Sequence, residues 1–130
     1  MSNRVRLWCN GYNLTIRSNG EVLGTDHDSD PDSKIEMSYA GDENRVRLLG
    51  INSQLYICFD DKGQLYGEKD RNNPGTIFMK DYDEISSYTT FQSTLGSKSS
   101  FIGIRKNGEL KSVENTDEGQ EAMQFLLRKL

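Results

Sequence analysis

The chain has 130 residues, a length typical of one domain that can bury a substantial core. Its 16 Lys and Arg against 20 Asp and Glu give a net charge of -4, which disfavours nucleic acid as a partner because phosphate binding needs a basic surface. No apolar run approaches the length of a membrane span, so no membrane insertion is expected. The first ten residues, MSNRVRLWCN, are polar and basic and do not form a signal peptide; this fits a cytosolic protein as well as a mature secreted domain.

The first predicted element is a strand at residues 3–9, and three similar segments follow it along the chain. IRSNGEVLG at 16–24 is echoed by YICFDDKGQLYG at 56–67 and by IRKNGELKS at 104–112. Their shared turn glycines, about 43 and 45 residues apart, are Gly20, Gly63 and Gly108. Asn, Asp and Gly at these places tolerate the positive φ of a tight turn, so each segment is predicted to form a β-hairpin.

Apolar residues keep one register relative to the three glycines. They lie six and four residues before each glycine, and two and fifteen residues after it. These twelve positions are Leu14, Ile16, Val22 and Ile35; Ile57, Phe59, Leu65 and Phe78; and Ile102, Ile104, Leu110 and Met123. Because strand side chains alternate with a period of two, this register predicts the buried face of each hairpin.

A second pair of strands is predicted after each hairpin, at 34–51 in the first copy and at 76–94 in the second. The alternating side chains are Ile35, Met37, Tyr39, Val46 and Leu48, then Phe78, Tyr82, Tyr88 and Phe91. In the third copy, 122–130 supplies one strand, and its partner is the N-terminal strand at 3–9. A helix over the last residues is set aside because the register places Met123 in a strand.

A period of about 40 residues that occurs three times predicts a closed assembly of β-units. Three units are too few for a propeller, which has at least four blades. The sequence therefore predicts an all-β fold, a single β-trefoil domain over residues 1–130 in which three pseudo-equivalent units close a barrel with a hairpin cap. The units are expected at about 10–52, 53–97 and 98–130, completed by the strand at 3–9.

Motifs for catalysis are missing from the sequence: it has no P-loop, no GxSxG, no HExxH and no CxxC. The single histidine, His27, leaves no plausible catalytic triad. We therefore expect no enzymatic activity and no cofactor. Cys9 and Cys58 are too few for a disulfide framework or a zinc site, and we expect them not to pair.

The stretch DHDSDPDSK at 26–34 places an aspartate at every second position, which superficially resembles a calcium-binding loop. An EF-hand loop needs a glycine and a glutamate at the places that Pro31 and Met37 occupy here. We therefore predict a solvated acidic loop and no metal site.

Asn13 begins the triplet NLT, a formal glycosylation sequon that matters only in a secreted protein. Its side chain is expected on the outward face of a strand, since the neighbouring Leu14 points inward.

Four segments, taken in order, resemble the fibroblast growth factor family. They are LWCNGYNLTIRSNGEVLGT at 7–25, LYICFDDKGQLYGE at 55–68, FIGIRKNGELK at 101–111 and GQEAMQFL at 119–126. Each motif is weak alone, but all four in order on one trefoil register are specific. The resemblance extends from about Arg6 to Leu127. It implies a secreted, monomeric ligand that binds and activates a receptor tyrosine kinase, usually with heparan sulfate as co-ligand.

The same resemblance assigns receptor contacts to Trp8, Tyr88 and Leu126. The alternative is that all three residues only pack in the core or at its rim. Two residues depart from the family pattern. Asp26 stands where the family usually has a receptor-contacting arginine, and Arg128 where it often has an apolar contact.

The glycosaminoglycan site implied by the resemblance carries too few positive charges for strong binding. Its matching residues are Asn10, Arg105, Lys106, Asn107, Lys111 and Gln120. The acidic residues Glu114, Asp117, Glu118 and Glu121 fill a stretch that is basic in the family. Because clustered positive charge binds polysulfated chains, we predict weak, salt-sensitive heparin binding.

Other readings of the sequence remain open. In one of them, the chain is an intracellular, non-secreted trefoil module that binds proteins without activating receptors. In another, it is a diverged or engineered trefoil without ligand activity. Trefoil lectins repeat Gln-x-Trp in each unit, whereas Trp8 is the only tryptophan here. Interleukin-1-like trefoils lack the Asn-Gly and Gly-Gln-x-Ala motifs.

Overall fold

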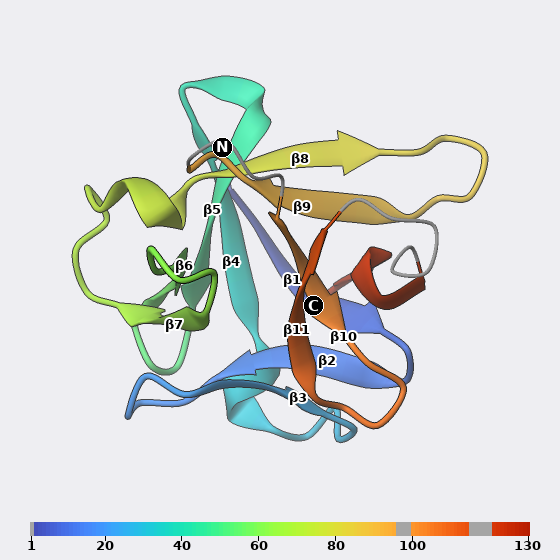
Figure 1. The fold of residues 1–130 in the computed structure, drawn as a ribbon. Helices are drawn as coiled ribbons and strands as arrows, with labels where there is room; N and C mark the ends of the chain where they lie inside the picture. Colours follow the sequence, from blue (N-terminus) through green and yellow to red (C-terminus); the bar gives the residue numbers. More distant parts are fainter. Residues whose placement is uncertain (1, 96–99, 115–120) are drawn as a thin grey trace.

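The computed structural model describes residues 2–95, 100–114 and 121–130, which form twelve β-strands and three short 3₁₀ turns (Figure 1). The strands are β1 (Ser2–Cys9), β2 (Tyr12–Ile16), β3 (Val22–Thr25), β4 (Ile35–Ala40), β5 (Asp42–Gly50), β6 (Tyr56–Phe59), β7 (Leu65–Glu68), β8 (Phe78–Tyr82), β9 (Thr89–Ser93), β10 (Ser100–Ile104), β11 (Leu110–Glu114) and β12 (Leu126–Lys129). The 3₁₀ turns are η1 (Pro31–Ser33), η2 (Pro74–Thr76) and η4 (Glu121–Met123). Within the described ranges, no helix has the length and apolar character needed to cross a membrane.

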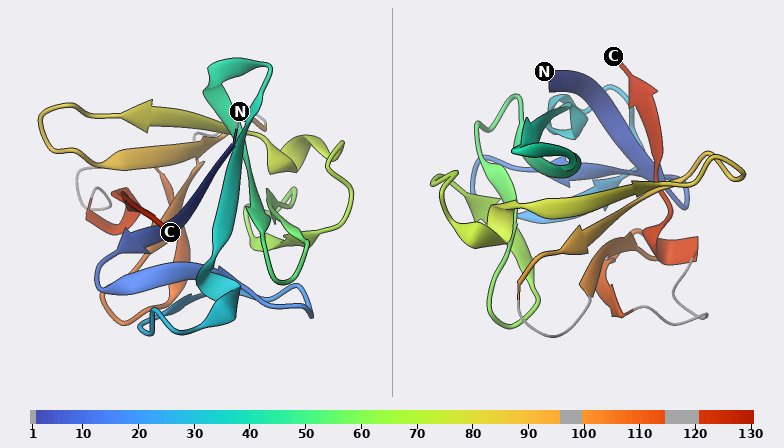
Figure 2. Two further views of the ribbon diagram at one scale, coloured as in Figure 1. Left: turned by 180° about the vertical axis from the view of Figure 1, so that it is seen from behind. Right: turned by 90° about the horizontal axis from the view of Figure 1, so that it is seen from above.

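Six strands form a barrel whose neighbours are all antiparallel. β1 pairs with β12 and β4, β4 with β5, β5 with β8, and β8 with β9. The ring closes where Thr89 and Phe125 exchange two backbone hydrogen bonds of 2.8 and 2.9 Å. The two ends of the chain lie side by side, and the Leu130 amide donates to the Arg4 carbonyl at 3.1 Å (Figure 2, right).

Three hairpins, β2–β3, β6–β7 and β10–β11, cap the barrel. Each pairs with the barrel strand that precedes it, through Trp8↔Asn13, Leu49↔Tyr56 and Gln92↔Phe101. Their turn glycines, Gly20, Gly63 and Gly108, have φ angles of 90°, 78° and 88°, as the sequence predicted. The same arrangement of four strands occurs three times, which confirms the predicted β-trefoil.

The predicted register describes the core well at all positions but one. Eight of the twelve predicted positions, including two in the third copy, are at most 2% exposed, and Leu65 and Leu110 pack against the core from its edge. Tyr39 and Tyr82, however, are 36% and 54% exposed. Both lie at the far ends of hairpins, and the β4–β5 register shifts beside Tyr39, so the alternation no longer predicts burial there.

The register fails at one position of the third copy, where Met123 lies in η4 and not in a strand. Met123 packs with Phe101 in a small separate cluster, and Phe125 fills the equivalent core place with no exposed surface. Phe125 meets Phe91 edge-on, with ring centroids 5.8 Å apart. The reason is that the third connection is two residues longer than the other two, which shifts the following strand along the sequence.

Candidate functional site

The outward side of the β1–β12 pair carries two of the three predicted receptor contacts. Along β1, Val5, Leu7 and Cys9 are buried, so Arg6 and Trp8 point away from the barrel. In the antiparallel register, Leu126 lies opposite Trp8, and Arg128 lies opposite Arg6. Directly opposed residues have neighbouring side chains. We call Arg6, Trp8, Leu126 and Arg128 the β1–β12 face.

Tyr88, the third predicted contact, lies beside this face. The next residue, Thr89, is bonded to Phe125, which directly precedes Leu126. Tyr88 and Trp8 also line one pocket of about 240 Å³, together with Asn10, Glu121 and Gln124. The structure therefore brings Trp8, Tyr88 and Leu126 together on one surface. All three are partly exposed, so they do not belong to the closed core.

A larger pocket of about 680 Å³ borders Tyr88 between the β8–β9 hairpin and η4. Its lining includes the apolar side chains of Phe101 and Met123 and the carboxylates of Asp81 and Asp83. Sequence reasoning missed this pocket because its wall is built by η4, where the register failed.

The tip of the β8–β9 hairpin presents Ile85, which is 97% exposed. The tip is held by its own side chains, since Asp83 accepts from the Ile85 amide at 3.0 Å and from the Ser86 hydroxyl at 3.0 Å. The sequence feature that could have predicted this exposed residue is the single isoleucine in the otherwise polar stretch DEISS.

Asp28 is the centre of a polar cluster at the edge of the β1–β12 face. Arg128 donates to both of its carboxylate oxygens, at 2.6 and 3.2 Å, and the Asn13 amide donates at 2.8 Å. These contacts, led by the hydrogen bond from Arg128, lower the pKa of Asp28 to about 2. Arg128, a departure from the family pattern, is thus engaged by Asp28. Asp26, the other departure, lies 3.1 Å from His27 on the exposed surface.

Asn13 lies on the outward side of β2, opposite Trp8, as expected, but its side chain is not exposed there. The residue is 1% exposed, and its side chain donates to Asp28 and accepts from Arg128 at 2.8 Å. Strand alternation gives the side of a strand but not what covers that side, and here the β3–β4 loop and β12 cover it. A glycan on Asn13 would displace both contacts.

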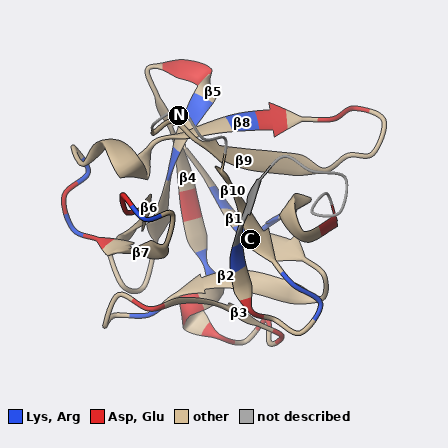
Figure 3. Cartoon of the chain, in the orientation of Figure 1, with Lys and Arg blue, Asp and Glu red and all other residues tan. Residues whose placement is uncertain are grey.

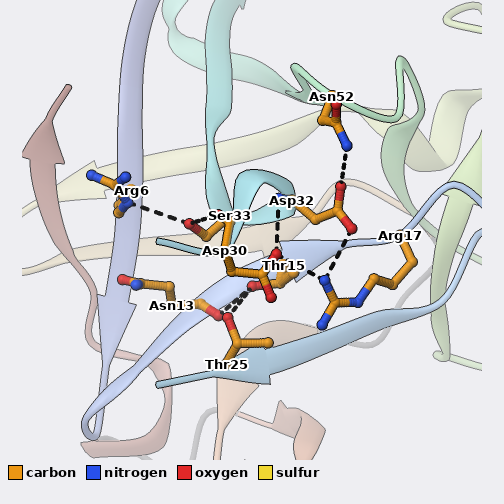
Figure 4. Close-up of polar contacts among 9 residues, drawn as sticks. All are labelled: Arg6, Asn13, Thr15, Arg17, Thr25, Asp30, Asp32, Ser33 and Asn52. Carbon is orange, nitrogen blue, oxygen red and sulfur yellow. Dashed lines mark hydrogen bonds and ion pairs between the residues drawn. The ribbon is translucent and has the colours of Figure 1, made fainter. Parts of the chain in front are cut away.

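The expectation of a solvated acidic loop is wrong for Asp30 and Asp32. Arg17 donates to Asp30 at 2.8 Å and to Asp32 at 3.0 Å, and Asn52 donates to Asp32 at 2.6 Å (Figure 4). Burial raises the pKa of Asp32, but the hydrogen bonds from Asn52 and Arg17 outweigh it, so the pKa lies below its usual value. These carboxylates face protein donors, and the network is structural.

Five of the six predicted heparin residues lie in or next to the β10–β11 turn and the β1–β2 turn. Lys and Arg are blue in Figure 3, and the β10–β11 turn is one of the blue segments. Arg105, Lys106 and Asn107 lie in the first turn, and Lys111 lies on β11. Asn10 lies in the second turn and donates to the Ile104 carbonyl at 2.7 Å, so it joins this region to the Trp8 pocket. Gln120 lies outside the described residues, as do the predicted acidic residues Asp117 and Glu118.

Glu121, an acidic residue of that stretch, lowers the positive charge of the β10–β11 turn. Glu121 lies 3.7 Å from the Lys106 ammonium, and both side chains are largely exposed. The pair is weak, but it offsets one of the three cations that the site offers to a polyanion.

Cys9 and Cys58 are both buried free thiols, as expected. The Cys9 thiol donates to the Ala122 carbonyl at 3.2 Å, and burial raises its pKa to about 11. Such a thiol is a poor nucleophile at neutral pH.

Comparisons with known proteins identify the family. The sequence model of the family described as fibroblast growth factor matches residues 3–126. Fibroblast growth factor 1 of Notophthalmus viridescens is 33% identical over 123 residues, which cover 92% of this chain and 91% of the relative. Fibroblast growth factor 1 of Cynops pyrrhogaster is 32% identical over 92% of this chain and 81% of its own length.

A viral relative is also similar. The fibroblast growth factor homolog of Autographa californica nuclear polyhedrosis virus is 28% identical over 109 residues, which cover 84% of this chain and 59% of that protein. The family match covers nearly the whole chain and includes the three hairpins and all barrel strands except the first residue of β1 and most of β12. The chain therefore belongs to the fibroblast growth factor family, whose members are signalling ligands and not enzymes.

Proposed function

We propose that this growth-factor ligand acts outside the cell, as a monomer, by binding and activating a receptor tyrosine kinase of the fibroblast growth factor receptor type. The contact surface is the β1–β12 face together with Tyr88. The observation that carries the proposal is that Trp8, Tyr88 and Leu126, which lie far apart in the sequence, converge on one partly exposed surface.

The chemistry of this surface suits a protein partner. Aromatic residues in partly open pockets commonly supply most of the binding energy of an interface. Trp8 is held on a barrel strand between β2 and β12, so it is already ordered in the free protein. A partner that covers the pocket therefore gains apolar burial with little loss of side-chain freedom.

Heparan sulfate is proposed as a weak co-ligand at the β10–β11 turn. Arg105, Lys106 and Lys111 supply positive charge there, and the Lys106–Glu121 pair lowers it. Few exposed cations give an interaction that salt screens readily. We expect elution from a heparin column at low salt; elution only at high salt would contradict weak binding.

The test is to measure binding of the purified protein to receptor ectodomains, with and without heparin, and receptor phosphorylation on cells. Trp8→Ala should weaken binding by at least tenfold, which corresponds to about 1.4 kcal/mol. Tyr39→Ala is the matched control, because Tyr39 is a 36% exposed aromatic residue on a different hairpin. Absence of binding to every ectodomain, or equal losses in both variants, would overturn the proposal.

A second candidate is a non-secreted, cytoplasmic trefoil module that binds proteins and does not activate receptors. The observation that favours it is that Cys9 and Cys58 are both free thiols, which suits a reducing compartment. Folded protein that binds no ectodomain but is retained inside expressing cells would support this candidate.

A further inference from the structure

Arg6 differs from the neighbouring arginines in what holds its guanidinium group. Its Nη2 donates to the backbone carbonyl of Asp28 at 2.7 Å, and its Nε donates to the Ser33 hydroxyl at 3.3 Å. Both acceptors are neutral oxygens supplied by the β3–β4 loop, and Figure 4 shows the contact with Ser33. The cation is therefore oriented without being neutralised by its own acceptors.

The carboxylates of this region are engaged by other cations. The Asp28 carboxylate accepts hydrogen bonds from Nη1 and Nη2 of Arg128. The Glu36 carboxylate lies 3.6 Å from Nε of Arg4. Among the described residues, Arg6 is in no ion pair within 4.0 Å.

The corner formed by Arg6, Arg128 and Asp28 thus holds two cations and one anion. Asp28 remains ionised at physiological pH, since its pKa is about 2, so the corner keeps a net charge of +1. Lys34 directly precedes Ile35, the antiparallel β4 partner of Val5, and so adds a further positive charge near Arg6.

Arg6 also lies on the surface that the proposed function assigns to the partner. It is the outward residue next to Trp8 on β1, and its cross-strand neighbour Arg128 is next to Leu126 on β12. A partner that covers Trp8 would exclude water from the guanidinium group of Arg6. A desolvated charge without a counter-charge is costly, so the covering surface must supply an anionic acceptor.

We propose that Arg6 determines partner specificity by donating hydrogen bonds to a carboxylate of the protein partner. The partner places this carboxylate next to the surface that covers Trp8. This inference rests on the proposed function, because it presumes a protein partner on the β1–β12 face. The planar guanidinium group is already oriented by Asp28 and Ser33, which favours a fork-shaped contact with a carboxylate.

The first experiment measures the affinity of Arg6→Gln, Arg6→Lys and Arg4→Gln for the ectodomains that the wild-type protein binds. Arg4→Gln is the matched control, since it removes the same charge from the same side of β1 at a 67% exposed side chain that pairs with Glu36. We expect Arg6→Gln to weaken binding at least tenfold and Arg6→Lys to restore part of the loss, whereas Arg4→Gln should change affinity less than twofold. Arg6→Gln should also reduce the dependence of affinity on salt.

A second experiment identifies the partner group. Single Asp→Asn and Glu→Gln variants of the bound ectodomain are combined with Arg6→Gln and with Arg4→Gln in double-mutant cycles. One carboxylate should couple to Arg6 and not to Arg4. If the wild-type protein binds an ectodomain and no carboxylate couples to Arg6, the inference is overturned while the proposed function stands.

The remaining outcomes are also decisive. If the wild-type protein binds no ectodomain, the proposed function fails, and this inference fails with it. If Arg6→Gln lowers retention on heparin but leaves ectodomain affinity unchanged, Arg6 serves a polyanion and the inference is overturned. If Arg6→Gln lowers the melting temperature, loss of affinity in the equally stable Arg6→Lys variant still supports the inference, and unchanged affinity there overturns it.

Discussion

The β3–β4 loop (26–34) and the β7–β8 loop (69–77) occupy equivalent places in the first two units and have the same backbone form. In each, an Asx side chain caps a 3₁₀ turn that begins with proline: Asp30 accepts from the Asp32 amide and Asn73 from the Gly75 amide, both at 3.0 Å. In each, the last residue of the turn, Ser33 or Thr76, donates its hydroxyl to the carbonyl of the cap, at 2.8 and 2.7 Å.

The charges on the two loops are different. The first loop holds Asp32 against Arg17 and Asn52, whereas Gly75 replaces Asp32 in the second loop. The second loop is instead held by uncharged donors to Glu68, from the Tyr66 hydroxyl and the Asn73 amide, both at 2.8 Å. The cap, the proline and the hydroxyl therefore determine the loop shape, and the ion pairs do not.

The charged residues of the first loop are therefore not needed for its shape and can act at the protein surface. The same loop supplies Asp28 and Ser33 to the β1–β12 face, where they orient Arg6 and Arg128. The second loop orients the equivalent cation in a similar way, because Arg47 on β5 donates to the Arg71 carbonyl at 3.0 Å. The two loops differ in the surface they border, because the cations of the β1–β12 face contact the first loop. The first loop is thus the one through which we expect partner specificity to be tuned.

The largest difference between the loops should appear on adding a side chain at the Gly75 position. A methyl group there would overlap the Phe59 backbone carbonyl and lie 2.8 Å from the Cys58 sulfur. We expect Gly75→Ala to lower the free energy of unfolding by about 3 kcal/mol, as measured by urea titration. Asp32→Ala at the equivalent place removes the contacts with Arg17 and Asn52 but creates no overlap, so it should cost less. Equal losses in the two variants would show that the loops are packed alike.

A smaller effect is expected from removing the cation of the first loop. Arg17→Met leaves the largely buried carboxylate of Asp32 with Asn52 as its remaining side-chain donor. We expect a loss of about 2 kcal/mol in the free energy of unfolding, because Arg17 is one-third exposed and water replaces part of the interaction. Arg17→Met with Asp32→Gly makes the first loop resemble the second and should recover about half of that loss. A double variant less stable than Arg17→Met alone would mean that the ion pairs do determine the loop shape.

The smallest expected effect is on the pH dependence of stability. The pKa values of Asp28 and Asp32 are lower in the folded protein than in the unfolded chain, so the unfolded chain binds protons first as the pH falls. The contribution of Asp28 to stability is complete above about pH 4 and is lost as the pH falls toward 2. The contribution of Asp32 is likewise lost as the pH falls, because its pKa is also lowered in the folded protein. Urea midpoints measured between pH 2 and pH 7 should show this decline, and Asp28→Asn should flatten it. An unchanged profile in Asp28→Asn would show that Arg128 does not lower the pKa of Asp28.

Much of the fold could be predicted because its determinants are local. A glycine that adopts positive φ and apolar residues at fixed distances from it specify each hairpin without reference to the rest of the chain. The misplaced Met123 has a different cause. The third connection is two residues longer, so the apolar residue of the following strand lies two residues later than the register predicts. Met123 and Phe125 are both apolar, so the sequence alone does not show which of them enters the core.

The candidate site could be predicted only in part, because its contacts are long-range. The resemblance indicated Trp8, Tyr88 and Leu126, but the sequence analysis did not single out Arg6, whose place beside Trp8 came from the structure. The contact between Arg128 and Asp28 joins opposite ends of the sequence, and no local pattern predicts it. The burial of Asn13 follows from that contact and was missed with it.

The pairing of β1 with β12 has a consequence for when the protein becomes competent to signal. Trp8 is synthesised long before Leu126, and contacts between residues so far apart in the sequence form slowly. A nascent or shortened chain that lacks β12 cannot place Leu126 beside Trp8. Recognition at this pair of strands would therefore require that β12 has been made and has paired with β1.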